Sequence, residues 1–290
     1  MDIVLAGATG FIGSHVRKLL SARHRVIALT REEFPVAERG VEWLCADLSE
    51  TCQSVQLPPR ADAIVYLAQS RHYRKFPDEA WPIFNLNIRA LMVMLEYARH
   101  CGAKRFFYAS SANVYKRSHR RITEASDLQP TTFYARSKLI AEMIIESYAQ
   151  YFHCDVFRLF TVYGLGQQHM LIPSLVDRVR QSQPIEIRGR RGLRLTPIYV
   201  TDVSAAIQAA LERESPPSGF EVFNVGGDEA LSIYDLGQVI GKALKIRPKF
   251  NFVGGARESG WMADSSKLTR TFGLRGFVGF QDGITRVLHG

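Results

Sequence analysis

Short apolar runs alternate with longer segments of helical spacing along the first half of this chain. The short runs are rich in Val, Ile, Leu and Phe and fall at residues 3–6, 26–29, 41–45, 63–67, 105–109 and 155–160. Apolar residues recur every three or four positions at residues 13–21, 82–100 and 133–151. Strands that alternate with helices are typical of βαβ units, and strands that are apolar on both faces suit a parallel sheet covered by helices on each side. The pattern therefore predicts an α/β fold of the Rossmann type, with a doubly wound parallel sheet.

The second half of the chain has a different texture. Glycine and proline recur at short intervals from residue 164 onward, the apolar segments become shorter, and helical spacing returns at residues 204–213 and 232–244. We expect a dinucleotide-binding Rossmann domain over residues 1–162. A smaller C-terminal α/β substrate-binding domain is expected over residues 163–290, partly interleaved with the first.

The composition is that of an ordinary globular protein. The chain has 290 residues, of which 46% are hydrophobic and 22% are charged, enough to bury a large core. The 4 cysteines and 8 histidines show no metal-ligand spacing, so we expect no bound metal. The first residues lack a basic segment followed by a long apolar stretch, and no window approaches the ~20 apolar residues that span a bilayer. We therefore expect a cytoplasmic protein without a membrane partner.

The formal net charge of +9 indicates an anionic partner. A basic protein can bind nucleic acid or an anionic small molecule. The densest basic run, at residues 116–121, has no interleaved aromatic residues. We interpret this run as a solvated loop, with a contact to a substrate phosphate as the alternative. We expect a small-molecule substrate and no nucleic acid.

A glycine-rich loop follows the first predicted strand and opens the first predicted helix. Its sequence is Gly7-Ala8-Thr9-Gly10-Phe11-Ile12-Gly13. Glycines at this spacing permit a tight turn, a close approach of the backbone to a pyrophosphate, and close packing of helix on strand. The helix N-terminus adds amide donors and a favourable dipole for an anion. The loop predicts a dinucleotide site at residues 7 and 9–13.

The end of the second predicted strand bears on the choice of cofactor. An acidic side chain there would accept hydrogen bonds from the adenine ribose and favour NAD. Thr30 stands at that position and Arg31 follows it. A guanidinium group can pair with a 2′-phosphate, so we favour NADP. NAD stays open because Glu32 and Glu33 come next.

Three residues suggest acid–base chemistry at an alcohol or ketone. Tyr134 and Lys138 are four apart in a predicted helix and therefore share one face. An ammonium group beside a phenol favours the phenolate and lowers the phenol pKa, which suits proton transfer near neutral pH. Ser111 ends the predicted strand at residues 105–109, and ligands of open α/β sheets bind at the carboxyl ends of strands. Ser111 is placed to hydrogen-bond the same substrate oxygen as Tyr134.

The glycine loop, Ser111 and the Tyr-x-x-x-Lys pair, in this order, resemble the extended short-chain dehydrogenase/reductase superfamily, the NAD-dependent epimerases and dehydratases. Further segments resemble that family: Asp47-Leu48, Tyr66-Leu67-Ala68-Gln69, Asn87-Ile88-Arg89-Ala90-Leu91, Arg158-Leu159-Phe160-Thr161-Val162-Tyr163-Gly164, Tyr199-Val200-Thr201-Asp202-Val203, Phe223-Asn224-Val225-Gly226-Gly227 and Asp264-Ser265-Ser266-Lys267-Leu268. The resemblance implies that Asp47, Leu48, Leu67, Ala68 and Gln69 line the cofactor site. It also implies that Lys138 touches the nicotinamide ribose.

The resemblance implies an enzyme that moves hydride at a carbinol or keto carbon of a nucleotide-activated sugar, by 4-epimerisation or 4-keto reduction. Tyr134 would be the general acid or base, and Ser111 and Asn113 would contact the substrate. Arg194 and Arg257 stand near the positions of the family's phosphate-binding arginines, although Arg194 is offset by one residue. Family dehydratases carry Asp-Glu where this chain has Ala112-Asn113, so dehydration is not expected.

Two other functions stay open at this point. A reductase of a non-sugar carbonyl would tolerate the altered phosphate-contact region, and a non-catalytic protein that senses the cofactor could use the same fold. The resemblance further implies a homodimer that packs through the predicted helices at residues 82–100 and 133–151.

Overall fold

A computed structural model describes residues 1–31, 37–48, 56–70, 73–214, 218–255 and 259–290. The chain divides into two compact units. The first unit consists of Met1–Val114, Gln129–Arg158 and Ser204–Phe223, and the second of Tyr115–Leu128, Leu159–Val203 and Asn224–Gly290. The chain leaves the first unit after Val114, after Arg158 and after Phe223, and the division after residue 162 stays a prediction. No helix among the described residues is long and apolar enough to cross a membrane.

A seven-stranded sheet in the order β3-β2-β1-β4-β5-β6-β11 forms the centre of the first unit. Its strands are β1 (Asp2–Ala6), β2 (Arg25–Thr30), β3 (Val41–Cys45), β4 (Ala63–Tyr66), β5 (Arg105–Ser111), β6 (His153–Leu159) and β11 (Gly219–Val225). β1 pairs in parallel with β2 and β4, β2 with β3, and β4 with β5. The chain order reverses at β1, which lies between β2 and β4. This arrangement confirms the predicted doubly wound fold, and its ligand site is expected at the carboxyl end of β1.

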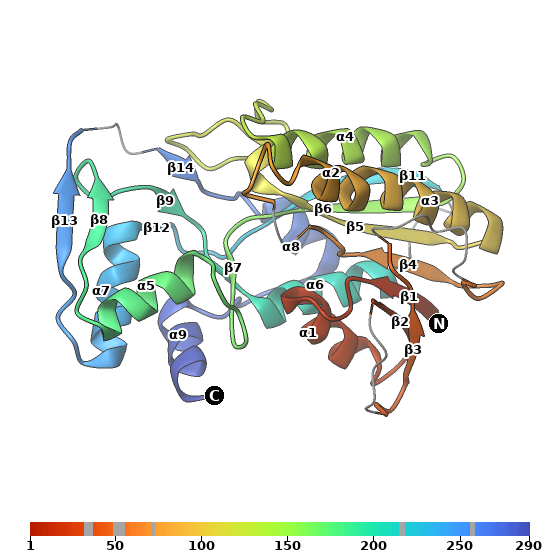
Figure 1. Cartoon of the computed structure of the whole chain (residues 1–290), viewed down its shortest axis with the longest axis horizontal. Helices are drawn as coiled ribbons and strands as arrows, with labels where there is room; N and C mark the ends of the chain where they lie inside the picture. Colours follow the sequence, from red (N-terminus) through yellow and green to blue (C-terminus); the bar gives the residue numbers. More distant parts are fainter. Residues whose placement is uncertain (32–36, 49–55, 71–72, 215–217, 256–258) are drawn as a thin grey trace. The chain divides into compact units, whose positions relative to one another are not determined.

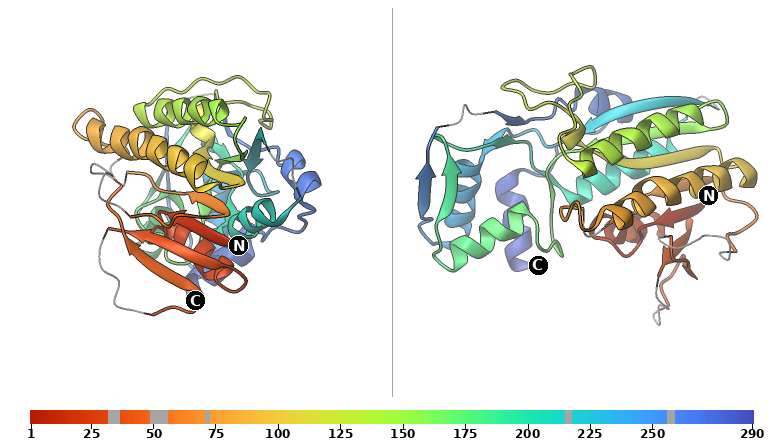
Figure 2. Two further views of the ribbon diagram at one scale, coloured as in Figure 1. Left: turned by 90° about the vertical axis from the view of Figure 1, so that its right-hand side faces the viewer. Right: turned by 45° about the horizontal axis from the view of Figure 1, so that its top comes forward.

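Helices cover both faces of this sheet (Figures 1 and 2). α3 (Ala90–Cys101) and α4 (Phe133–Ser147) lie side by side on one face, and α1 (Phe11–Leu20) and α6 (Val200–Glu212) lie on the other. The apolar face of α3 packs with α4 on inward residues of β1, β2, β4, β5 and β6, including Val4, Ile64 and Phe106. Burial on both faces explains why these strands are apolar at nearly every position.

The helix predicted at residues 82–100 is interrupted, which corrects the sequence prediction. α2 (Ala80–Phe84) runs into a π-helical turn at Asn85–Arg89, and α3 follows. The wider turn holds Asn87 inward, where it is fully buried and its Nδ2 donates to Ser137 Oγ of α4 at 2.9 Å. An extra residue in a helical turn leaves the apolar spacing on either side nearly helical, so the pattern alone could not reveal it.

The second unit is built from short strands and three packed helices. Its strand pairs are β7 (Val162–Tyr163) with β10 (Ile198–Tyr199), β8 (Ile185–Arg188) with β13 (Phe250–Val253), and β9 (Arg194–Leu195) with β12 (Leu231–Ser232) and β14 (Gly260–Trp261). Its core lies among α5 (Leu171–Arg180), α7 (Ile233–Leu244) and α9 (Phe280–His289). α8 (Ser266–Phe272) follows β14. A capping box at Ser232 and Asp235 fixes the start of α7.

Candidate active site

The glycine loop joins the end of β1 to the first turn of α1. Gly7 has a φ of +85°, in the left-handed region that favours glycine. A Cβ on Gly7 would lie 2.7 Å from the Ala68 nitrogen, and a Cβ on Gly13 would lie 2.0 Å from the Gly7 carbonyl oxygen. The first glycine therefore admits the neighbouring strand end, and the third lets α1 pack on the loop.

This loop fits the phosphates of a dinucleotide. Thr9 and Gly10 are exposed. Gly10 is the N-cap residue of α1, and it has no side chain to accept hydrogen bonds from the first backbone amides of the helix. The free amides and the helix dipole favour an anion at this point. Leu67 and Ala68 run against Gly7, where the resemblance places them beside the cofactor. Phe11 and Ile12 form the start of α1 and are half-buried.

The residues expected around the adenosine lie at the ends of β2 and β3. Thr30 is buried, Arg31 is exposed, and the Arg31 carbonyl accepts a hydrogen bond from Cys45 Sγ at 3.7 Å. Asp47 is half-buried, and Leu48 packs into the core on the α3 face of the sheet. Glu32 and Glu33 lie outside the described residues.

Ser111, Tyr134 and Lys138 come together at the carboxyl end of β5. Thr132 caps α4 by accepting a hydrogen bond from the Ala135 nitrogen, so Tyr134 lies in the first turn and Lys138 one turn further on. The Ser111 side chain lies close enough to the Tyr134 phenol to lower its pKa. Tyr134 donates to Gln69 Oε1 at 3.2 Å. The resemblance placed Gln69 at the cofactor, and the structure places its amide on the phenol.

Burial is the largest influence on Tyr134, and it raises the phenol pKa. The Ser111 side chain lowers it, the neighbouring Tyr73 raises it, and the charge of Arg74 lowers it. The rings of Tyr73 and Tyr134 have centroids 4.7 Å apart, and the Arg74 guanidinium lies 5.2 Å from the centre of the Tyr73 ring. The phenol therefore holds its proton at neutral pH in this structure. Sequence reasoning missed Tyr73 and Arg74 because no motif or periodicity marks this loop.

Lys138 is buried to 2% exposure beside the phenol. Its Nζ donates to the Ala109 carbonyl at 2.8 Å and lies 4.7 Å from the ring centre of Tyr108 and 5.9 Å from that of Tyr134. Burial lowers the pKa of Lys138 to about 7, and the charge of Glu142 opposes that shift. The ammonium charge predicted to act on Tyr134 is therefore only partly present at neutral pH.

The candidate substrate residues are spread over the chain. Asn113 lies in a 3-10 turn (Ala112–Val114) directly after β5, and its nitrogen donates to Ser111 Oγ at 3.2 Å. Arg194 lies on β9 in the second unit and is half-buried. Arg257 lies outside the described residues.

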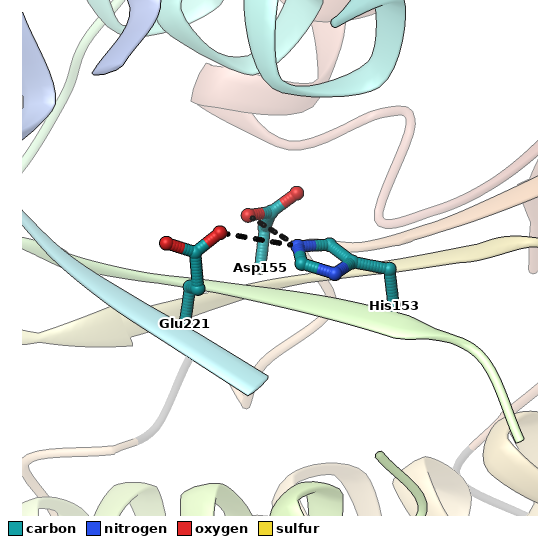
Figure 3. Close-up of side chains that lie close together, drawn as sticks. All are labelled: His153, Asp155 and Glu221. Carbon is teal, nitrogen blue, oxygen red and sulfur yellow. Dashed lines mark ion pairs between the residues drawn. The ribbon is translucent and has the colours of Figure 1, made fainter. Parts of the chain in front are cut away.

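A second cluster of ionisable side chains lies in the first unit (Figure 3). His153 and Asp155 on β6 and Glu221 on β11 point toward one another, with His153 Nε2 3.4 Å from an oxygen of each acid. Such a set could ligate a metal. Arg213 Nη2, however, lies 2.8 Å from His153 Nε2, 2.7 Å from Asp155 Oδ1 and 2.5 Å from Glu221 Oε2. The guanidinium thus takes the place that an ion would occupy between these atoms.

The fold, the glycine loop and the group of Ser111, Tyr134 and Lys138 together define a Rossmann enzyme of the short-chain dehydrogenase/reductase class. Residues 3–226 match the model of the NAD dependent epimerase/dehydratase family, and the chain belongs to that family. This confirms the predicted resemblance and the prediction of an enzyme that uses a nicotinamide cofactor.

Relatives of similar length support the same assignment. The chain is 27% identical to an uncharacterised UDP-glucose epimerase of Bacillus subtilis, over 98% of this chain and 96% of the relative. It is also 27% identical to a UDP-glucuronate 4-epimerase of Thermodesulfobacterium geofontis, over 78% of this chain and 71% of the relative. The fold matches that of a Bacillus cereus UDP-glucuronic acid 4-epimerase, solved with NAD and UDP-4-deoxy-4-fluoro-glucuronic acid. Here the TM-score is 0.87 and the identity 24%, over 99% of this chain and 98% of that one.

Proposed function

We propose that this enzyme interconverts two nucleotide-activated sugars by inverting carbon 4. The observation that carries the proposal is that Ser111, Tyr134 and Lys138 meet at the carboxyl end of β5, a strand two places from β1 and its glycine loop. The relatives named above, a UDP-glucose epimerase and a UDP-glucuronate 4-epimerase, support the same substrate class.

The glycine loop would hold the cofactor pyrophosphate, with Gly7 and Gly13 giving the close approach and the first amides of α1 donating. A nicotinamide held there would supply reversible hydride transfer at carbon 4, which is redox chemistry that no side chain supplies. Ser111 would hydrogen-bond the oxygen on carbon 4 and fix its direction. Tyr134, once deprotonated, would take the hydroxyl proton as the 4-keto sugar forms and give it back after the sugar turns. The charge of Lys138 would favour the phenolate.

The residues at the end of β2 bear on whether the cofactor is NADP or NAD. Thr30 and the exposed Arg31 favour NADP, because a guanidinium pairs with a 2′-phosphate and no carboxylate stands at position 30 to repel it. NAD is the nucleotide named with several solved relatives of the same fold. Titration of both nucleotides decides between these two lines of support.

Arg194 and Arg257 are proposed to contact the substrate diphosphate. Guanidinium groups suit that dianion, and the excess of basic residues in the chain agrees with an anionic substrate.

A homodimer is proposed through the α2–α4 face of the first unit. Large apolar side chains stand exposed there, with 73% exposure at Trp81 on α2 and 62% at Met143 on α4, and Phe84, Met92 and Ile140 add to them. Exposed apolar side chains that gather on adjacent helices indicate a protein–protein contact. Figure 2 shows α3 and α4 side by side, as such a surface requires.

The test incubates the protein with UDP-glucose, UDP-glucuronate or UDP-N-acetylglucosamine and a catalytic amount of NAD or NADP. We expect the 4-epimer to accumulate, detected by proton NMR, without net consumption of cofactor. Tyr134→Phe should bind cofactor normally and lose about 10²–10⁴-fold in turnover, since only the proton-transfer group is removed. Net reduction of the added NAD or NADP would indicate an oxidoreductase that releases the oxidised sugar instead of its 4-epimer. Turnover of no nucleotide sugar by a folded, cofactor-binding protein would overturn the proposal.

A further inference from the structure

Three ionisable residues follow one another along the buried face of α4. Tyr134, Lys138 and Glu142 are spaced by four, and spacing by four keeps side chains on one face of a helix. Their exposures are 9%, 2% and 3%. The proposed mechanism uses the first two residues and leaves the third without a role.

Side chains from two strands of the sheet hold the Glu142 carboxyl group. Arg158 on β6 donates to it through Nε, 3.1 Å from Oε1, and through Nη2, 2.6 Å from Oε2. Ser110 on β5 donates its hydroxyl to Oε1. Arg158 and Ser110 therefore fix the position of the Glu142 carboxyl group one helical turn beyond Lys138.

Lys138 Nζ donates to the Ala109 carbonyl and lies over the faces of the Tyr108 and Tyr134 rings, contacts that attract an ammonium charge. Removal from water opposes these attractions and disfavours the charged form. Burial lowers the Lys138 pKa to about 7, and the charge of Glu142 raises it against that effect. The titratable or charged groups around this position are Tyr66 on β4, Tyr108 on β5, Tyr134 and Glu142 on α4, and Arg158 on β6.

We propose that Glu142 is a positioning residue for the reaction: its buried carboxylate keeps Lys138 charged and thereby acts on Tyr134 from two helical turns away. This inference rests on the role proposed for Lys138 beside Tyr134. Arg158 and Ser110 hold the carboxylate in place. The alternative is a purely structural ion pair that fastens α4 to the sheet, without influence on Lys138.

The two roles differ in what they do to the titration of Lys138. The experiment labels lysine with carbon-13 at Cε and follows each resonance against pH in the full chain without cofactor, with Lys138→Met to assign the signal. We expect Lys138 to titrate near neutral pH in the wild type. In Glu142→Gln its midpoint should fall by about one pH unit, a tenfold weaker proton affinity. Glu142→Asp keeps the charge and should restore most of the shift.

Arg158→Lys is the matched control, because it disturbs the same ion pair and keeps the charge. It should destabilise the protein and leave the Lys138 midpoint in place. If Glu142→Gln does not fold, the double variant Glu142→Gln/Arg158→Gln is compared with Arg158→Gln, so that the two proteins differ only in the carboxylate.

Equal midpoints in wild type and Glu142→Gln, or equal shifts in Glu142→Gln and Arg158→Lys, would overturn the inference. With a substrate in hand, the alkaline limb of kcat/KM should move to lower pH in Glu142→Gln alone. The NMR titration needs no substrate, so failure of the proposed function and failure of this inference are separate results.

Discussion

Replacing Gly13 by alanine tests how closely α1 packs on the glycine loop. The added Cβ would lie 2.0 Å from the Gly7 carbonyl oxygen, 2.9 Å from the Gly7 carbonyl carbon and 3.1 Å from the Ala8 Cα. Ordinary contact begins at 3.4 Å, so helix and loop must separate by about 1.4 Å, the difference between 3.4 and 2.0 Å. All three neighbours are backbone atoms and cannot move aside by changing rotamer.

The direction in which Gly13→Ala changes the free energy of unfolding shows whether the added methyl group clashes or has room. At a glycine with room for a methyl group, alanine stabilises a protein by about 0.4–1 kcal/mol through the unfolded state. Overpacking costs about 1–3 kcal/mol or more, so we expect a net loss of about 2 kcal/mol in the free energy of unfolding. The displaced amides should also weaken cofactor binding by tenfold or more, which corresponds to about 1.4 kcal/mol.

Urea unfolding of the cofactor-free protein and calorimetric titration of NAD and NADP measure these two effects. Gly10→Ala is the matched control in the same loop. Its Cβ would lie 3.2 Å from the Gly7 oxygen, and its φ of −73° suits alanine, so its stability should change little. A Gly13→Ala protein as stable as wild type, with unchanged cofactor affinity, would refute the argument from packing.

Three further predictions follow from the cofactor end, the ionic cluster and the exposed helices. NADP should bind about tenfold more tightly than NAD, and Arg31→Ala should remove that preference in calorimetric titrations; a wild-type preference for NAD would contradict it. Arg213→Met should lower the free energy of unfolding by about 3–5 kcal/mol because it leaves the buried Asp155 and the half-buried Glu221 uncompensated, whereas Arg23→Met at an exposed pair should change it by less than about 0.5 kcal/mol. Light scattering should give a dimer mass for the wild type and a monomer mass for Met143→Glu, and a monomeric wild type would exclude the dimer.

The central strands were predictable because a strand that is buried on both faces appears in the sequence as a continuous apolar run. β4 is buried at every position and ends one residue before the end of the predicted run at residues 63–67. In the second unit, α7 differs from its predicted range by one residue at the start. α5 was not predicted, and it lies in the half of the chain where glycine and proline recur. Pro173 is the third residue of α5, where the backbone N–H has no intrahelical partner to lose. A proline in the first turn is therefore compatible with a helix, because no intrahelical hydrogen bond is lost there.

The proposed catalytic residues also depend partly on local sequence and partly on tertiary contacts. The spacing of four predicted that Tyr134 and Lys138 share one helix face. The position of Ser111 at the end of a predicted strand placed it near the ligand site. The contacts that set their protonation come from segments far apart in the chain: Gln69 reaches the phenol from the loop after β4, and Arg158 fixes the carboxylate of Glu142 from β6.

A Tyr-x-x-x-Lys pair specifies which groups meet but not which of them is charged. An exposed lysine at this spacing would carry a full charge at neutral pH, because its ordinary pKa lies well above 7. Lys138 is buried, and burial brings its pKa down to about 7, where small influences decide its protonation. The balance then depends on a carboxylate one turn away and on the residues of two strands that hold it. Whether the motif is active at a given pH is thus a property of the packed sheet and helix, which a four-residue spacing cannot encode.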